Sequence, residues 1–378
     1  MRVAINALFW NQPTTGSGQY VRRLVSQLAE SAPDVQQLLI APRGQSVYRP
    51  PAGVTVASGA LSARGGVRKL LYEQWALGRT AGHLTADLVH VPYFAPPRWS
   101  RLPVVVTIHD VIPLLLRGYR GGPLVRAYSA WVAAAAHRAA AVLTDSHAAA
   151  RDILQHLRLP AERVHVVHLA ADAAYRPVEG EADQELRNIS QRLGLPESYI
   201  LYLGGFDRRK QVPELLQAFA RSGLAKELPL VVAGRLPGHD SAFAPDPRPL
   251  ASALGIARQV IFTGWVEEAD KPALYRGARV LAFPSLYEGF GLPVLEALAC
   301  GTPVVAALGS SLDEVAGPGG LLVDGTDTEA LADALARVVQ DEQLHATLRA
   351  EGLAHAAHFS WEATARQTAQ VYREVLRG

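Results

Sequence analysis

Short apolar runs recur along the chain, and segments with helical spacing of their apolar positions separate them. Runs of this kind, bounded by Gly, Pro or polar residues, predict buried strands. The predicted strands comprise residues 3–7, 86–91, 104–108, 141–144, 164–168, 199–204, 228–233, 259–263, 279–283, 303–306 and 321–323. Strands that alternate with helices predict an α/β fold with parallel sheets.

The length of the chain favours two domains, because 378 residues are many for a single core. Residues 173–198 are polar and acidic and contain Pro177, Gly180 and Pro196, so we interpret them as an interdomain link. We predict a first domain in residues 1–175 and a second in residues 176–360. Residues 361–378 are predicted to form a capped terminal helix.

The two halves of the chain carry opposite net charge. Residues 1–176 hold 19 Lys and Arg against 9 Asp and Glu, a net charge of +10, and residues 177–378 carry −8. A basic first half favours an anionic partner such as a membrane surface or a phosphorylated acceptor, and ordinary surface charge is the alternative. Within it, residues 61–84 mix Arg68, Lys69 and Trp75 among leucines, as a peripheral membrane contact would, although a core-packing helix has a similar pattern.

The composition predicts a soluble globular protein, since no apolar run approaches the ~18 residues that a membrane span needs. The first ten residues resemble a strand and not a signal peptide. The single cysteine, Cys300, lies in an apolar helix and is expected to be a buried structural thiol. We expect a cytoplasmic protein, with attachment to the inner face of the membrane as an open alternative, and no nucleic-acid partner.

The most informative stretch is residues 279–305, RVLAFPSLYEGFGLPVLEALACGTPVV. It predicts a strand, a loop with Gly289 and Gly291, a helix with Pro293 at its start and Gly301 after its end, and a second strand. A helix N-terminus behind a glycine loop presents free N–H groups, which suit a phosphate.

Two carboxylates belong to this unit, Glu288 in the loop and Glu296 eight positions later in the helix. Glu296 has two interpretations, a charge that offsets the helix dipole or a ligand contact. For Glu288, which lies between Tyr287 and Gly289, a ligand contact is the better interpretation.

The string EGFGLPVLE, residues 288–296, resembles the E-x7-E motif of the retaining glycosyltransferases of family 4, and the flanking FPS and GTPVV also match. The resemblance implies the GT-B fold: α/β, two Rossmann-like domains that face an interdomain cleft, with the terminal helix crossing back to the first domain. It also implies that Glu288 contacts the donor sugar and Glu296 the nucleotide ribose. The loop backbone at Gly289, Phe290, Gly291 and Leu292 would face the diphosphate and the sugar.

The segment 199–220, YILYLGGFDRRKQVPELLQAFA, predicts another strand, glycine loop and helix. Cations at a helix start oppose the dipole unless an anion lies there, so this loop also predicts a phosphate site. It resembles the family's diphosphate-binding loop, in which Lys210 matches the lysine. Gly205 stands where many members have arginine, and Arg209 is expected to substitute. After the strand at 259–263, the backbone at Val266 would hold the nucleobase.

Two loops of the first half follow predicted strands, where open α/β sheets bind ligands. Gly16 and Gly18 lie in the first; the resemblance implies backbone approach to the donor phosphate or acceptor, and a plain tight turn is the alternative. His109 and Asp110 follow residues 104–108. By resemblance His109 points into the cleft and is catalytic, while Asp110 orients it, touches the acceptor or caps a turn.

The resemblance implies transfer of a hexose, with mannose from GDP-mannose favoured, to a glycan or lipid-linked glycan in polysaccharide or O-antigen-type synthesis. UDP-glucose and dTDP-rhamnose are alternative donors. A sugar-nucleotide epimerase of GT-B fold and a non-catalytic binding subunit are alternative functions. The sequence has no D-x-D triplet and no His/Cys cluster of metal-binding spacing, so we expect no metal and no other cofactor.

Overall fold

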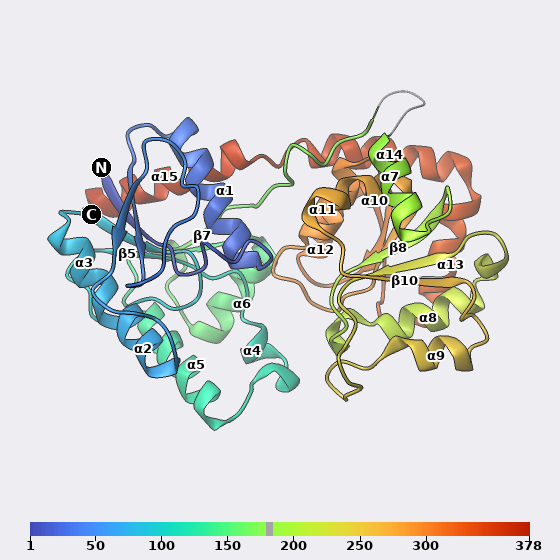
Figure 1. Ribbon diagram of the computed structural model, residues 1–378, viewed down its shortest axis with the longest axis horizontal. Helices are drawn as coiled ribbons and strands as arrows, with labels where there is room; N and C mark the ends of the chain where they lie inside the picture. Colours follow the sequence, from blue (N-terminus) through green and yellow to red (C-terminus); the bar gives the residue numbers. More distant parts are fainter. Residues whose placement is uncertain (179–183) are drawn as a thin grey trace. The chain divides into compact units, whose positions relative to one another are not determined.

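The computed structural model describes residues 1–178 and 184–378 (Figure 1). The chain forms two compact units, one of Met1–Leu169 with Ser360–Gly378 and one of Ala170–Phe359. Residues 179–183 of the predicted link, including Gly180, lie outside the described residues. No helix of the described residues combines the length and the apolar character that a membrane span requires.

Between residues 1 and 169, the first unit contains a parallel sheet in the order β3-β2-β1-β4-β5-β6-β7. The strands are β1 (Arg2–Asn6), β2 (Gln36–Ala41), β3 (Thr55–Ser58), β4 (Leu88–Val91), β5 (Val104–Thr107), β6 (Ala141–Thr144) and β7 (Val164–Val166). This order, with helices in the connections, is the Rossmann-like arrangement that the alternating pattern predicts.

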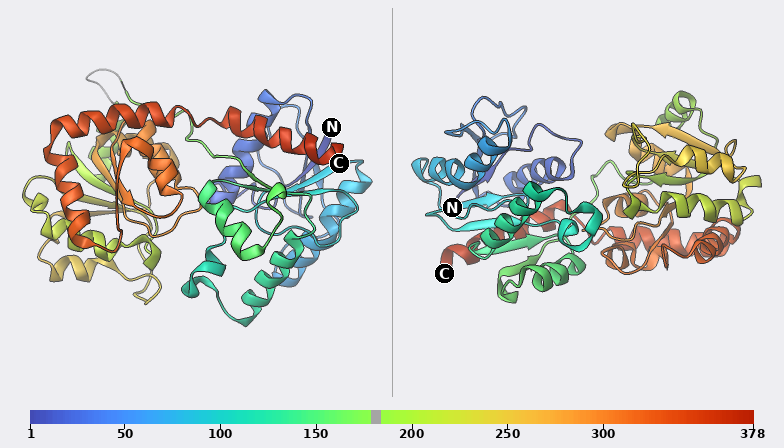
Figure 2. Two further views of the ribbon diagram at one scale, coloured as in Figure 1. Left: turned by 180° about the vertical axis from the view of Figure 1, so that it is seen from behind. Right: turned by 90° about the horizontal axis from the view of Figure 1, so that it is seen from below.

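The helices of the first unit include α1 (Gly16–Ser31), α2 (Gly66–Leu71), a π-helical turn (Tyr72–Ala76), α3 (Leu77–His83), α4 (Ile112–Leu115), α5 (Pro123–Ala136), α6 (His147–Leu157) and the terminal α15 (Trp361–Arg377), with 3-10 turns at Arg117–Tyr119 and Ala161–Arg163. Helix α15 packs alongside α1 (Figures 1 and 2). The hydroxyl of Tyr372 on α15 bonds Nδ1 of His90 on β4 at 2.6 Å, deep in the core. The last helix therefore supplies part of the first unit's interior.

The second unit has a parallel sheet within residues 184–359, in the order β10-β9-β8-β11-β12-β13. Its strands are β8 (Tyr199–Leu203), β9 (Leu230–Ala233), β10 (Val260–Gly264), β11 (Ala278–Phe283), β12 (Val304–Ala307) and β13 (Gly320–Val323). The side chains of β8, β9, β11 and β12 are almost all buried on both faces, as in a sheet that helices cover on both sides. The side chains of the edge strands β10 and β13 are mostly half-buried.

The helices of the second unit are α7 (Gln184–Leu193), α8 (Val212–Arg221), α9 (Pro247–Ala253), α10 (Lys271–Gly277), α11 (Leu292–Ala299), α12 (Leu312–Ala316), α13 (Thr328–Gln340) and α14 (Glu342–Ala356), with 3-10 turns at Arg208–Lys210, Leu224–Lys226, Glu268–Asp270 and Gly317–Gly319. In Figure 1, α8, α9 and α13 lie on one face of the sheet and α10 and α11 on the other. Each strand thus delivers its C-terminal loop to one edge, where the loops after β8 and β11 meet.

Candidate active site

The loop between β11 and α11 is shaped by Gly291 and Ser311. Gly291 caps α11 with a φ of 105°, and a Cβ there would lie 2.6 Å from the side chain of Leu312, so only glycine fits. Ser311 is fully buried, and its hydroxyl bonds the carbonyl oxygens of Glu288 at 2.8 Å and Phe290 at 2.7 Å. The N–H groups of Gly291 and Leu292 have no backbone acceptor among the described residues. The loop therefore presents donors at the start of a helix.

Glu288 pairs with two cations from the loop after β8. Its Oε1 lies 2.6 Å from Nζ of Lys210 and 2.7 Å from an Nη of Arg209, and it accepts from the hydroxyl of Ser285 at 2.5 Å. All three contacts converge on one carboxylate oxygen. Burial raises the pKa of Glu288, but Lys210 and Arg209 outweigh it and hold that pKa below its usual value. Glu288 is therefore ionised at neutral pH.

The two cations are held in fixed positions by their own surroundings. Lys210 is buried, and its ammonium lies 4.9 Å from the ring centre of Phe283 at the end of β11. Arg209 also donates to the carbonyl of Tyr287 at 2.5 Å, and its Nε lies 3.4 Å from Asp207. Two cations are thus balanced by two carboxylates. A phosphate can enter this arrangement by replacing one carboxylate as the partner of the cations.

Glu296 lies apart from this cluster, on the second turn of α11 and not on its first. The hydroxyl of Tyr275 on α10 donates to its Oε2 at 2.8 Å, and Tyr175 lies beside Tyr275 with ring centres 5.9 Å apart. Burial raises the pKa of Glu296 to about 7, although Lys271 and the Tyr275 hydroxyl act to lower it. Because Glu296 lies beyond the first turn of α11, it is poorly placed to offset the helix dipole.

Gly205 and Val266 take separate places at the same edge of the sheet. Gly205 is exposed after β8, and its carbonyl accepts from the hydroxyl of Tyr202. Val266 is buried two residues beyond the end of β10, beside an exposed Trp265 whose ring lies 5.3 Å from the Arg235 guanidinium. Gly205 thus shares the loop after β8 with Arg209 and Lys210, whereas Val266 belongs to the loop after β10.

In the first unit, His109 pairs with Asp145, which the sequence did not single out as a site residue. His109 Nδ1 lies 2.7 Å from Asp145 Oδ2, and the ring of Tyr20 meets the imidazole edge-on with centres 4.8 Å apart. Burial lowers the pKa of His109, but Asp145 more than compensates and raises it above the usual value. Asp110 instead accepts from the N–H of Ile112 at 2.9 Å, so it caps the turn that starts α4.

Backbone packing requires glycine at only one of the two positions 16 and 18 near the start of α1. A Cβ on Gly18 would lie 2.0 Å from the carbonyl oxygen of Gln12, so close backbone packing requires glycine there. A Cβ on Gly16 would meet nothing within 4 Å. Helix α1 begins at Gly16, because the hydroxyl of Thr15 accepts from the Gly18 N–H at 3.2 Å and caps it.

Comparison with known proteins covers almost the whole chain. Residues 14–175 match the family model described as Glycosyltransferase Family 4, and residues 184–354 match the one described as Glycosyl transferases group 1. A D-inositol 3-phosphate glycosyltransferase of Salinispora arenicola is 32% identical over 97% of this chain and 89% of its own length. The chain belongs to glycosyltransferase family 4.

Other relatives of this glycosyltransferase agree with that assignment. The O-antigen chain mannosyltransferase B of Escherichia coli is 29% identical, with 96% of each chain covered. Among solved structures, a sucrose-phosphate synthase of Thermosynechococcus elongatus superimposes with a TM-score of 0.78 at 23% identity, over 100% of this chain and 99% of the other. The glycosyltransferase WaaG of lipopolysaccharide biosynthesis gives a TM-score of 0.69 at 18% identity, over 98% and 99%. These structural likenesses confirm the predicted GT-B fold.

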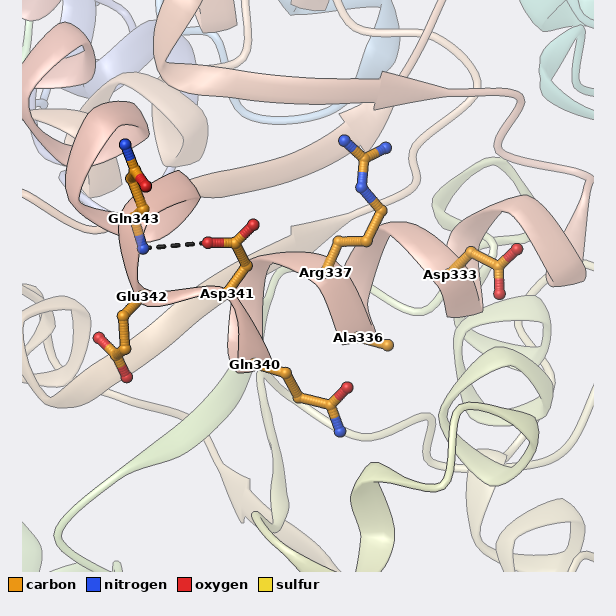
Figure 3. A pocket seen from close by; sticks show the side chains of 7 residues that line it. All are labelled: Asp333, Ala336, Arg337, Gln340, Asp341, Glu342 and Gln343. Atoms are coloured by element: carbon orange, nitrogen blue, oxygen red, sulfur yellow. Dashed lines mark hydrogen bonds between the residues drawn. The ribbon is translucent and has the colours of Figure 1, made fainter.

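A hollow elsewhere on the second unit of the glycosyltransferase does not coincide with this chemistry. Its described lining consists of residues from α13 and α14: Asp333, Ala336, Arg337, Gln340, Asp341, Glu342 and Gln343 (Figure 3). Asp341 caps α14 by accepting from the N–H of Gln343 at 3.0 Å, so its charge is already used structurally. We therefore place the candidate site at the loops after β8 and β11, and not in this hollow.

Proposed function

We propose that this glycosyltransferase moves a hexose, with mannose favoured, from a nucleotide diphosphate sugar to a glycan or lipid-linked glycan, with retention of the anomeric configuration. One observation carries the proposal: Lys210 and Arg209 converge on Glu288 beside the free N–H groups that start α11. Cations and helix amides together suit a diphosphate, and a carboxylate between them suits sugar hydroxyls.

In the proposed reaction the bond between the anomeric carbon and the diphosphate oxygen breaks, and the acceptor oxygen bonds to that carbon on the same face. The acceptor's proton passes to the leaving phosphate, so no protein nucleophile is needed. Lys210, Arg209 and the amides of Gly291 and Leu292 neutralise the charge that develops on the leaving group. Glu288 holds the sugar hydroxyls and stabilises the positive charge on the ring.

The remaining predicted residues have positioning roles in this proposal. Glu296 binds the ribose hydroxyls, the backbone at Val266 holds the base, and the backbone at Gly205, Gly289 and Phe290 faces the diphosphate and sugar. From the first unit, His109, Asp110 and the loop with Gly16 and Gly18 serve the sugar and the acceptor. Since Lys210 and Arg209 supply the positive charge, we propose that transfer needs no metal.

GDP-mannose is the donor we favour. The support is the similarity to the O-antigen chain mannosyltransferase B and to the serotype-specific mannosyltransferase WbdA of Escherichia coli, both 29% identical. Donor choice depends largely on backbone contacts near Val266, which leave little trace in side chains. UDP-glucose and dTDP-rhamnose are therefore the donors to compare.

A second acceptor class has its own support. Relatives named D-inositol 3-phosphate glycosyltransferase are 32% and 34% identical to this chain, more than the mannosyltransferases. A phosphorylated acceptor also agrees with the net charge of +10 over residues 1–176. Inositol phosphate consequently belongs in the acceptor panel beside mannose-containing glycans.

Peripheral membrane contact is the last part of the proposal. We define the basic–aromatic stripe as the exposed residues Val67, Leu71, Trp75 and Arg79, at four-residue spacing through α2, the π-helical turn and α3, together with Arg64 and Arg68. The guanidinium of Arg79 lies 5.1 Å from the Trp75 ring centre. Exposed apolar side chains flanked by arginines suit an anionic lipid surface. Such contact would bring the enzyme to a lipid-linked acceptor.

The deciding experiment incubates the protein with GDP-mannose, UDP-glucose or dTDP-rhamnose, with mannose-containing glycans or inositol phosphate, in EDTA or in magnesium. Mass spectrometry identifies the product and NMR its anomeric configuration. An α-mannoside formed from GDP-mannose in EDTA is the expected result. An isomerised sugar nucleotide without acceptor would indicate an epimerase, and an inverted product would overturn the mechanism.

A further inference from the structure

Asp145 and His109 follow neighbouring strands of the first sheet. Strands β5 and β6 pair in parallel with Thr107 opposite Leu143, and the N–H of Ile108 still bonds the carbonyl of Leu143 at 2.8 Å. Two residues beyond this pair, the same register places His109 beside Asp145. The register of the two strands is therefore enough to make His109 and Asp145 neighbours at the carboxyl edge of the sheet.

The pair is short and sheltered. Asp145 is 3% exposed, and its Oδ2 lies 2.7 Å from Nδ1 of His109. The other ring nitrogen, Nε2, is enclosed, and it makes no hydrogen bond of ordinary geometry, although the Pro92 carbonyl acts on the ring. A buried donor without a good acceptor costs free energy, which a substrate oxygen that arrived there would recover. Hydrogen bonds at catalytic sites often tighten only when substrate is bound.

Two further contacts fix the plane of the imidazole. The ring of Tyr20 on α1 meets it edge-on, at 83° between planes. The Tyr20 hydroxyl is itself anchored to Oγ1 of Thr107 at 3.0 Å, and Thr107 also bonds Nε2 of His90 at 2.8 Å. Tyr20 therefore supports one side of the ring while Asp145 holds its Nδ1 edge.

The charged and polar groups around His109 favour the protonated form of its ring. Asp145 and Asp110 both favour the protonated ring, and the carbonyl of Pro92 also raises its pKa. His90 also lies nearby, and a positive charge on His90 would disfavour protonation of His109. Burial lowers the pKa of His90 to about 3, so His90 stays neutral. Tyr20 also stays neutral, because burial raises its pKa. These groups together favour the protonated form of His109, with Nδ1–H toward Asp145.

A buried ion pair contributes little to folding, because removing both charges from water offsets their attraction. The pair lies at the carboxyl edge of the sheet, where open α/β folds bind ligands, and Nε2 of His109 can turn to a ligand. A role in function therefore explains this position of the pair better than a contribution to folding. We propose that Asp145 is a positioning residue for His109, fixing its ring and its charge so that Nε2–H donates to an oxygen of the bound sugar or acceptor. This inference rests on the proposed site role of His109.

The first test is NMR titration of the histidines in the full-length protein. Comparison with the spectrum of H109Q assigns His109 among the 12 histidines. In D145N the amide keeps the shape but removes the charge, so the pKa of His109 should fall by about one or more. D87N, which neutralises an exposed carboxylate before β4, is the matched control and should leave that pKa in place. An unchanged His109 titration in D145N would refute the positioning role.

The second test is a double-mutant cycle on transfer. D145N should lower kcat/KM about tenfold or more and shift its pH profile toward acid, while thermal unfolding shows an intact fold. In the H109A background, D145N should have no further effect, because Asp145 acts through His109. Additive losses would overturn the inference. Full activity of H109A would instead remove the site role of His109, while the NMR titration still decides the pairing.

Discussion

The ammonium of Lys210 lies 2.6 Å from the Glu288 carboxylate, and Arg209 reaches the same oxygen at 2.7 Å. The carboxylate that we propose holds the sugar therefore pairs with the two cations that we propose hold the diphosphate. Under this proposal, a nucleotide diphosphate shares or replaces these ion pairs when it binds. We therefore expect Glu288 to affect nucleotide affinity as well as transfer.

The first prediction concerns E288Q. Gln keeps the hydrogen-bonding shape but leaves Lys210 and Arg209 uncompensated, so affinity for a nucleoside diphosphate should rise, by about tenfold at low salt. Transfer should fall sharply, because the carboxylate no longer stabilises the positive charge on the sugar. Calorimetric titration with GDP, alongside E329Q at an exposed carboxylate of α13, measures the effect. Weaker GDP binding would contradict the charge-sharing geometry.

The second prediction concerns K210M, which keeps the buried chain against Phe283 and removes the ammonium. Loss of one charge-assisted contact should weaken GDP binding by about 1.5–3 kcal/mol, roughly tenfold to a hundredfold. The dependence of affinity on salt should also become shallower. Circular dichroism checks that the fold survives. Unchanged GDP affinity in a folded K210M protein would remove Lys210 from the diphosphate site.

The third prediction follows from the pKa of about 7 at Glu296, against an ordinary value of 4.5. A carboxyl whose pKa is raised by folding stabilises the protein fully below its unfolded pKa and loses that contribution as pH rises through its folded pKa. The loss between pH 4.5 and 7 is about 3 kcal/mol. E296Q lacks this titration, so its stability relative to wild type should increase by up to that amount from pH 5 to pH 8. Urea unfolding at several pH values tests this, and a pH-independent difference would refute it.

The fourth prediction concerns Y372F on the terminal helix. The substitution removes the hydroxyl that satisfies Nδ1 of buried His90, which should destabilise the first unit by about 1–3 kcal/mol. His90 has a pKa of about 3, so the loss should be the same at pH 6 and pH 8. Hydrogen exchange should show faster opening in β4 and α15 than in β8 and β11. Equal changes in both units would argue against a local effect.

The fifth prediction concerns the basic–aromatic stripe. The variant W75A/R79A removes an exposed Trp and the arginine beside it, and should reduce binding to vesicles that contain anionic lipid by about tenfold. Transfer to a soluble acceptor should stay unchanged. R337A/Q340A, on the hollow of the second unit, is the control pair. Equal sedimentation of all three proteins with the vesicles would exclude the stripe as a membrane contact.

Much of the fold was predictable, because buried parallel strands appear as apolar runs. The run that ends at Phe283 became β11, and the glycine at 301 follows α11 with a φ of 79°, as a helix end requires. Strands β2 and β3 were not predicted. The sequence of β2, QQLLIA, contains an apolar run that could have identified it, whereas β3, TVAS, is exposed at the sheet edge and has no such run.

The sequence identified several residues of the candidate site, but it did not predict the contacts between them. The glycine loops and the family resemblance pointed to Glu288, Lys210 and Arg209, but their convergence on one oxygen depends on side-chain directions that the sequence does not contain. Asp145 was missed as a site residue, although it follows β6 directly and is in register with His109, two positions beyond β5. The contact of Tyr275 with Glu296 joins two helices across the second unit and had no local signal.

The packing of α15 on α1 has a consequence for how the protein is made. The hydroxyl that completes the His90 network belongs to Tyr372, 282 positions later in the chain. During translation, residues 170–359 therefore leave the ribosome and can fold before the first unit has its final helix. The first unit therefore begins synthesis before the second unit and cannot complete its packing along α1 until α15 has been made.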